Sequence, residues 1–322
     1  MSAQSTHQHQ LLPGAILLEE QTSMETFNRD TGVRHPLFMT FFSFPQVLDR
    51  HGEEHGKVTR FMSACRANDA TPALTLEAFG GLRSYTRDDI LALADLLAHF
   101  RTPLILRWNH EMNGSWYPWG QQPALYVDRF REFAGVIHQH VPGAAMAWTP
   151  NQGWGYPWPG CKYFTPPPEG QADPYAPYYP GDDCVDWVGL SFYHWGETRG
   201  ANEVPPPDKW SSCLGFGNAI PNFHDLYAVG RRKPMMIAET SALYDLNNTR
   251  GGGASEEEIK AAWIRQVYGL TERMPWLKAI FWFNILKHEE EVGGQVDWRI
   301  SANPAVARIY RESVSRAYSS GS

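Results

Sequence analysis

Two glutamates occupy positions from which their carboxyl groups could act together on one substrate. Glu111 lies just beyond the apolar residues 104–106, and Glu239 directly follows the apolar residues 235–238. One carboxyl group can donate a proton to a leaving oxygen while a second, ionised one attacks the neighbouring carbon, which is the chemistry of glycosidic bond cleavage. An ionised Glu239 would also disfavour ionisation of Glu111 and keep it a proton donor. The alternative is structural, since each glutamate could cap the following helix or pair with an arginine such as Arg107.

Polar and aromatic side chains cluster after the same apolar runs, where core packing does not require them. The candidate binding and supporting residues are Arg107, His110, Asn113, Trp116, Trp119, Asn151, Tyr193, Trp195 and Trp282. A flat indole ring can cover the C–H face of a sugar, while amide, imidazole and phenol groups bind its hydroxyls. Residues 150–180 hold nine prolines and eight aromatics, which predicts a rigid loop lining a substrate cleft. Packing of these rings onto the protein wall is the alternative for each of them.

Short apolar runs alternate with segments of helical period along the whole chain, which is typical of a buried parallel sheet with crossover helices. The expected strands are residues 14–18, 37–42, 73–79, 104–107, 145–148, 185–191, 235–238 and 279–283. Capping boxes at Thr22/Glu25, Thr86/Asp89 and Ser255/Glu258 predict helix starts. Eight such pairs predict an α/β fold, a single (β/α)₈ TIM barrel with long aromatic and proline-rich βα loops. In this fold the chemistry lies at the carboxyl ends of the strands.

Length and composition limit the other classes of protein. The 322 residues are 43% hydrophobic and 20% charged, which excludes a disordered chain, and no apolar run approaches the roughly 20 residues of a membrane span. The net charge of −7 disfavours nucleic acid and anionic membranes as partners. We expect a disordered segment at 1–12, a barrel at 13–318 and a frayed tail at 319–322. No signal peptide is visible in the chain, so it is cytoplasmic unless a leader has been removed.

Cysteine and histidine patterns give weaker signals. Cys161 and Cys184 bracket the proline-rich loop and are a candidate disulfide. His51, Glu54 and His55 fit an HxxEH zinc pattern, but Gly52 weakens the helix and no third ligand is evident nearby. We therefore expect no metal and no cofactor.

Four ordered motifs resemble glycoside hydrolase family 26. The segment His110-Glu-Met-Asn-Gly114, followed by Trp116-Tyr-Pro-Trp119, resembles the acid/base motif of that family. The segments Val185-Asp-Trp-Val-Gly189 with Tyr193, and Pro234-Met-Met-Ile-Ala-Glu239, resemble its sixth strand and its nucleophile strand. Trp282-Phe-Asn284 with Asp297-Trp-Arg299 resembles its closing segment. The motifs cover about two thirds of the chain, from the fourth strand to the last helix.

The resemblance implies a retaining endo-β-glycosidase, with a polysaccharide as partner and β-1,4-mannan as the first candidate substrate. It implies that Glu111 is the acid/base, Glu239 the nucleophile, His110 a partner that orients a carboxylate, Tyr193 a phenol bonded to the nucleophile, and Trp282 the platform under the sugar. Mixed-linkage β-glucan and β-1,3-xylan remain alternative substrates. A non-catalytic carbohydrate-binding protein is the alternative of a different class. We expect a monomer, and the resemblance implies secretion if a leader has been trimmed.

Overall fold

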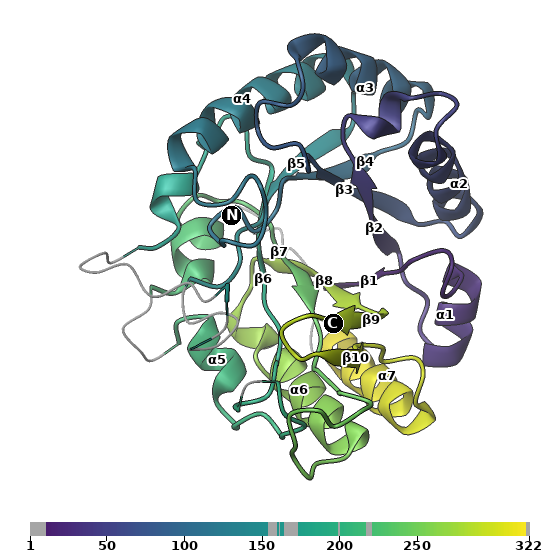
Figure 1. Cartoon of the computed structure of the whole chain (residues 1–322), viewed down its shortest axis with the longest axis vertical. Coiled ribbons are helices and arrows are strands. Elements are labelled where there is room, and N and C mark those ends of the chain that lie inside the picture. The colour runs from purple at the N-terminus through teal and green to yellow at the C-terminus, as the bar shows by residue number, and fades with distance from the viewer. Residues whose placement is uncertain are drawn as a thin grey trace, which may run out of the picture.

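Eight parallel strands close into a barrel, and helices surround it (Figure 1). The computed structural model describes residues 11–153, 160, 162–163, 173–198, 200–216 and 221–319. Each strand pairs with its neighbours in chain order, and β1 closes the ring by pairing with β8. The predicted (β/α)₈ barrel is therefore confirmed.

The strands of the barrel are β1 (Leu12–Ile16), β2 (Leu37–Ser43), β3 (Thr71–Glu77), β4 (Leu104–Trp108), β5 (Ala144–Trp148), β6 (Trp187–Ser191), β7 (Met235–Thr240) and β8 (Leu277–Phe283). The α-helices are α1 (Met24–Thr31), α2 (Glu53–Ala67), α3 (Arg87–His99), α4 (Pro123–His140), α5 (Lys209–Cys213), α6 (Glu256–Gly269) and α7 (Pro304–Ser319). Short 3₁₀ turns lie at η1 (Gln46–Leu48), η2 (Ala176–Tyr178) and η4 (Thr271–Arg273), and η3 (His224–Val229) is a π-helix. None of the helices among the described residues has the length and apolar character needed to cross a membrane.

Two predicted strands are displaced by two residues in the structure. Strand β1 begins at Leu12, because Leu12 pairs with Ala279 of β8, so the barrel starts inside the segment that was predicted to be disordered. Strand β3 runs from Thr71 to Glu77 rather than over 73–79, because its ladder with β2 begins at Thr71. The apolar pattern locates a strand, but the ladder with its neighbours sets its ends.

Two of the three predicted capping boxes are confirmed. Thr86 with Asp89 starts α3, and Ser255 with Glu258 starts α6, in each case with both reciprocal hydrogen bonds. Helix α1 differs, because Ser23 rather than Thr22 is its N-cap and accepts from the Thr26 amide at 3.1 Å.

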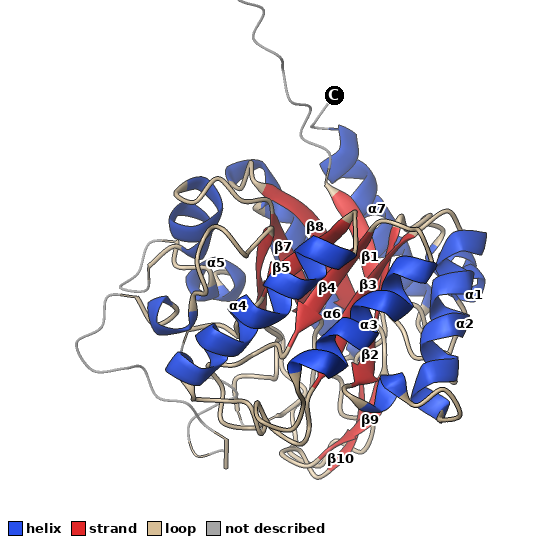
Figure 2. Ribbon diagram, turned by 90° about the horizontal axis from the view of Figure 1, so that it is seen from above, coloured by secondary structure: helices blue, strands red, loops and turns tan. Residues whose placement is uncertain are grey.

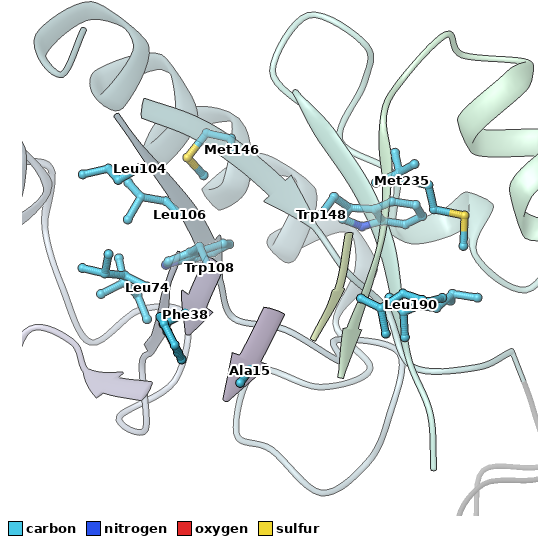
Figure 3. Packing of buried hydrophobic residues seen from close by; sticks show 14 of the residues in the cluster. Ala15, Phe38, Leu74, Leu104, Leu106, Trp108, Met146, Trp148, Leu190 and Met235 are labelled. Atoms are coloured by element: carbon cyan, nitrogen blue, oxygen red, sulfur yellow. The ribbon is translucent and has the colours of Figure 1, made fainter. Parts of the chain in front are cut away.

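Side chains of the barrel strands alternate between two apolar layers. Along β8, Ile280 and Trp282 belong to the layer between strands and helices, while Ala279, Phe281 and Phe283 belong to the barrel interior. Figure 3 shows part of the outer layer, including residues from β4, β5 and β7. This alternation decides which residues of a strand can reach the mouth of the barrel.

The loops at the carboxyl ends of the strands gather at one end of the barrel together with the antiparallel hairpin β9 (Leu286–Glu289) and β10 (Gly294–Asp297) (Figure 2). Most of the proline-rich segment, residues 154–159, 161 and 164–172, lies outside the described residues. Cys184 carries a free thiol in the structure, and Cys161, the other half of the candidate disulfide, lies outside the described residues.

Close packing between β6 and β7 leaves no room for a side chain at Gly189. A Cβ atom on Gly189 would lie 2.6 Å from the Met236 carbonyl oxygen, whereas one on Gly135, which is exposed in α4, would meet nothing within 4 Å. We expect Gly189→Ala to lower the free energy of unfolding by about 1–3 kcal/mol. The matched change Gly135→Ala should raise it by about 0.5–1 kcal/mol. Urea denaturation measures both, and a stable Gly189→Ala protein would contradict this packing.

Candidate active site

A cavity of about 400 Å³ opens where the strands end, within the size range of small-molecule sites. Five carboxyl groups line it: those of Glu77, Glu111 and Glu239 near the strand ends, and those of Glu289 and Glu291, which lie with Lys287 in the hairpin of β9 and β10. Most of the remaining wall is aromatic, formed by Phe41, Trp116, Tyr117, Tyr163, Tyr193, Trp195, Phe283 and Trp298. The structure thus brings the two predicted glutamates into one cavity and adds three further glutamates.

An irregularity in β7 turns Glu239 toward the cavity. Ala238 already belongs to the barrel interior, so strict alternation would send the next side chain outward. The register of β7 shifts against both neighbours, between Leu190 and Ser191 on β6 and between Ile237 and Thr240 on β7 itself. The shift places Glu239 against the cavity and leaves the Thr240 hydroxyl to accept from the Trp263 indole of α6 at 3.0 Å. Bulges that re-aim a side chain in this way are frequent beside active sites.

Arg107 holds Glu239 from inside the barrel. Its guanidinium, which is fully buried, pairs with Glu239 Oε1 and also donates to the hydroxyls of Thr149 at 2.7 Å and Ser191 at 2.6 Å. The Tyr193 hydroxyl donates to Glu239 Oε2. The surroundings of Glu239 therefore suit a carboxylate anion, with one charged and one neutral donor in fixed positions.

Glu111 lies in a tight turn after β4. Asn109 and Glu111 both have positive φ, 44° and 54°, a conformation that costs free energy and is frequent at functional sites. The Asn109 side chain accepts from the Ala78 amide at 2.9 Å, and the Glu111 amide donates to the Thr149 carbonyl at 3.0 Å. These contacts with the β3 and β5 ends hold the turn and direct the Glu111 carboxyl into the cavity.

Within the described part of the chain, the hydrogen-bond partners of the Glu111 carboxyl group are neutral. The Asn151 amide donates to Oε1 at 2.8 Å, and the Trp116 indole donates to Oε2 at 2.7 Å. Burial, together with repulsion from Glu239, raises the pKa of Glu111 to about 7, although Arg107 and the two donors act in the opposite direction. A carboxyl group with such a pKa can give up and take back a proton near neutral pH. The cavity thus pairs a proton donor with a carboxylate, the combination used for glycosidic cleavage.

His110 and Trp119 support the site without lining the cavity. The His110 Nε2 atom lies 3.1 Å from the Tyr117 hydroxyl and 3.6 Å from Glu239 Oε1, and burial holds the pKa of His110 well below its usual range. His110 is therefore a neutral ring that packs against Glu239. The Trp119 indole donates to the His110 carbonyl at 2.7 Å and stacks on Tyr117, so Trp119 positions this turn rather than contacting a ligand.

Asn113 and Asn151 tie the loops after β4 and β5 together. The Asn113 side chain donates to the Asn151 carbonyl at 2.9 Å and accepts from the Asn151 amide at 2.8 Å. This pair fixes the Asn151 side chain that donates to Glu111. The predicted supporting role of both residues thus has a geometric basis.

Trp282 does not line the cavity, so the prediction that it forms a sugar platform is wrong. Its ring lies in the outer layer, where its indole donates to the Tyr268 hydroxyl at 3.1 Å. Strand alternation sends the next residue, Phe283, into the cavity instead.

Trp298, just after β10, lines the cavity and was not among the predicted site residues. Its indole donates to Glu289 at 2.8 Å, and its ring meets Trp195 edge to face with centroids 4.8 Å apart. Tyr193 and Trp195 line the cavity as predicted. The sequence signal for Trp298 was its place between Asp297 and Arg299, whose side chains pair at 2.7 Å.

Glu77 was not among the predicted site residues. The strand predicted over 73–79 placed it inside a strand, whereas it is the last residue of β3 and faces the cavity. The sequence feature that could have identified Glu77 as a site residue is its charge within an otherwise apolar run.

The HxxEH segment serves the fold of α2. Glu54 accepts from the Ser43 amide at 2.8 Å, and His55 Nδ1 lies 3.0 Å from the Val47 carbonyl. Within the described part of the chain, no group of three or more His, Cys, Asp or Glu side chains could hold a metal ion.

Comparison with known proteins finds similarity to glycosidases. The model of glycosyl hydrolase family 26 matches residues 82–204, which include Glu111 and end before Glu239. Endoglucanase H of Acetivibrio thermocellus is 27% identical over 235 residues, 70% of this chain and 21% of the relative. A β-1,3-xylanase of a Vibrio species is 26% identical over 155 residues, 48% of this chain and 26% of the relative. The chain thus spans about a quarter or less of these curated relatives.

A solved structure supports the same fold. The catalytic domain of the family 26 endo-β-1,4-mannanase from Bacillus sp. JAMB-750 superposes with a TM-score of 0.61. The match covers 96% of this chain and 86% of that domain at 16% identity.

The Arg107–Glu239 pair should dominate the stability of the site. Arg107→Met leaves a buried carboxylate without its cation, and we expect the free energy of unfolding to fall by about 3–5 kcal/mol. Arg107→Met combined with Glu239→Gln should recover a large part of that loss, because no unpaired charge remains. Urea denaturation of the two single variants and the double variant measures this coupling. Additive losses would show that the pair is not coupled.

Proposed function

We propose that this chain is a family 26 glycosyl hydrolase and a retaining endo-β-glycosidase that hydrolyses a β-linked polysaccharide. The observation that carries the proposal is the unequal pair of carboxyl groups in one cavity. Glu239 is bound by Arg107 and Tyr193, while Glu111 has neutral donors and a pKa raised to about 7 by burial and by Glu239. In this proposal Glu239 is the nucleophile and Glu111 the acid, and the different surroundings of the two carboxyl groups set these roles.

In the proposed reaction, Glu239 attacks the anomeric carbon while Glu111 protonates the departing glycosidic oxygen. The C–O bond to the leaving sugar breaks, and a covalent glycosyl–enzyme ester forms on Glu239. Esterification removes the charge of Glu239, which lowers the pKa of Glu111 and lets it accept a proton from water. That water attacks the anomeric carbon, releases Glu239 and gives net retention of configuration.

Aromatic rings around the carboxyl groups support a carbohydrate substrate. Trp195 and Trp298 pack edge to face, and Tyr193 lies against Trp298 with ring centroids 5.1 Å apart. Rings held in this way offer apolar faces for sugar C–H bonds. Endoglucanase H and the β-1,3-xylanase, the relatives matched by sequence, favour β-glucan as the first substrate to test and β-1,3-xylan as an alternative. β-1,4-Mannan, the substrate implied by the motif resemblance, is the other candidate.

The first test is hydrolysis. We expect wild-type protein to release reducing ends from at least one of barley β-glucan, β-1,3-xylan, glucomannan and galactomannan. Glu239→Ala should lower the rate on the order of 10⁴-fold, because the attacking group is lost. Glu272→Ala, an exposed change in η4 at the opposite end of the barrel, is the matched control. Proton NMR of the first product should show the β anomer. Binding without hydrolysis would favour a carbohydrate-binding protein, and an initial α anomer would contradict retention.

The pH dependence should report the protonation of Glu111. Because Glu111 must be protonated to act as the acid, kcat/KM should fall as the pH rises through its pKa of about 7. Trp116→Phe removes an N–H that stabilises the Glu111 carboxylate, so the pKa rises and the alkaline limb moves to higher pH. In Trp119→Phe the lost donor served a backbone carbonyl, and the limb should keep its position. A shift to lower pH in Trp116→Phe would refute this assignment.

A further inference from the structure

One carboxyl group of the cavity, that of Glu77, is unpartnered among the residues that the structure describes. Glu77 is only 8% exposed, yet among the residues that the structure describes its carboxyl group makes no hydrogen bond and no ion pair. Its backbone is fully engaged, since the Glu77 carbonyl accepts from the Phe44 amide at 2.9 Å. The Glu77 side chain borders the cavity, where a polar group can meet a ligand. Since no described residue occupies this carboxyl group, it is available to bind a ligand in the cavity.

The cations near Glu77 are engaged elsewhere. All three donor nitrogens of Arg107 are directed at Thr149, Ser191 and Glu239. Lys57 pairs with Glu54 at 4.0 Å. Neither side chain supplies Glu77 with a hydrogen bond.

The environment favours the neutral form of Glu77. Burial and then repulsion from Glu239 raise its pKa to about 8, against the attraction of Arg107 and Lys57 and with a small further repulsion from Glu54. A neutral carboxyl group offers one O–H donor and a carbonyl acceptor side by side. A sugar hydroxyl is likewise a donor and an acceptor, so one or two hydroxyls can satisfy both atoms.

We propose that Glu77 is a specificity-determining residue that hydrogen-bonds a sugar hydroxyl in the cavity beside Glu111 and Glu239. This rests on the proposed function only in so far as the cavity holds a sugar. A site built to hydrogen-bond a substrate hydroxyl discriminates strongly against ligands that lack it, because its own polar group is then left unpaired. A bound sugar hydroxyl would form the hydrogen bonds that the Glu77 carboxyl group does not form with the described residues.

Two variants of Glu77 separate this role from alternatives. Glu77→Gln keeps a neutral donor and acceptor of the same length, whereas Glu77→Met keeps the length and removes both. We expect Glu77→Met to raise KM for the hydrolysed polysaccharide by about 10- to 100-fold, and Glu77→Gln to stay within about threefold of wild type. Because the Glu77 carboxyl group forms no hydrogen bond or ion pair with the described residues, neither variant should have a lower melting temperature than wild type. Glu272→Ala is again the control.

Binding without turnover is measured in a Glu111→Gln background, which keeps Glu239 and its charge beside Glu77. Isothermal titration calorimetry uses tetrasaccharides of mixed-linkage β-glucan, β-1,3-xylan and β-1,4-mannan as probes. The added Glu77→Met change should weaken binding of the best probe by about 10- to 100-fold, and Glu77→Gln should not.

The outcomes distinguish this inference from the proposed function. Hydrolysis and binding unaffected by Glu77→Met would overturn the role of Glu77 and leave the proposed function standing. A wild type that cleaves nothing, with binding that Glu77→Met weakens, would overturn the proposed function and support the role of Glu77. Equal losses in Glu77→Gln and Glu77→Met would overturn the neutral donor and acceptor, since an ionised carboxylate would then be required. A lower melting temperature in Glu77→Met would indicate a structural role, and binding of no probe would overturn both.

Discussion

The ion pair between Arg107 and Glu239 is the interaction on which the rest of the site depends. Both groups are buried at the mouth of a barrel, where removal of two charges from water is costly unless further hydrogen bonds satisfy them. Arg107 meets that condition by donating to residues beyond β5, at the end of β6 and on β7. The guanidinium thus ties together the ends of four strands. A shift of any one of them would leave a buried charge unsatisfied, which makes the mouth of the barrel rigid.

The other features of the cavity follow from where that pair lies. The bulge in β7 is needed because Glu239 would otherwise point away from Arg107. With one carboxylate fixed there, a second carboxyl group nearby is held protonated by burial and by repulsion. The strained turn at Asn109 and Glu111 brings that second group into the same space. The difference between the two glutamates is therefore a property of their surroundings, and it is the difference that the proposed reaction uses.

Sequence patterns predicted the barrel and its two principal glutamates, because both depend on local features. Alternating apolar runs specify strands, and polar residues at their ends specify the mouth. What they left uncertain was the register, which depends on pairing between segments distant in sequence. The two-residue displacement of β3 meant that Glu77 was not predicted to lie at the end of a strand. Trp282 lies in the outer layer because of the alternation within β8, and Trp298 reaches the cavity because it follows the hairpin of β9 and β10. The bulge in β7 had the opposite effect, since strict alternation would have excluded Glu239.

Glu77, Glu111 and Glu239 lie near one buried guanidinium, that of Arg107, and this limits how many of the three can be ionised together. Arg107 compensates one carboxylate, and each further anion would have to be buried against a like charge. Burial and the charge of Glu239 accordingly raise the pKa values of both Glu77 and Glu111. The two differ in their partners: Glu111 is held by Asn151 and Trp116, whereas Glu77 has no partner among the described residues. A proton donor must be positioned before the substrate arrives, but a group that binds a hydroxyl must be left free for it. Burial and the charge of Glu239 therefore keep two carboxyl groups protonated for different tasks: Glu111 donates a proton, and Glu77 binds a sugar hydroxyl.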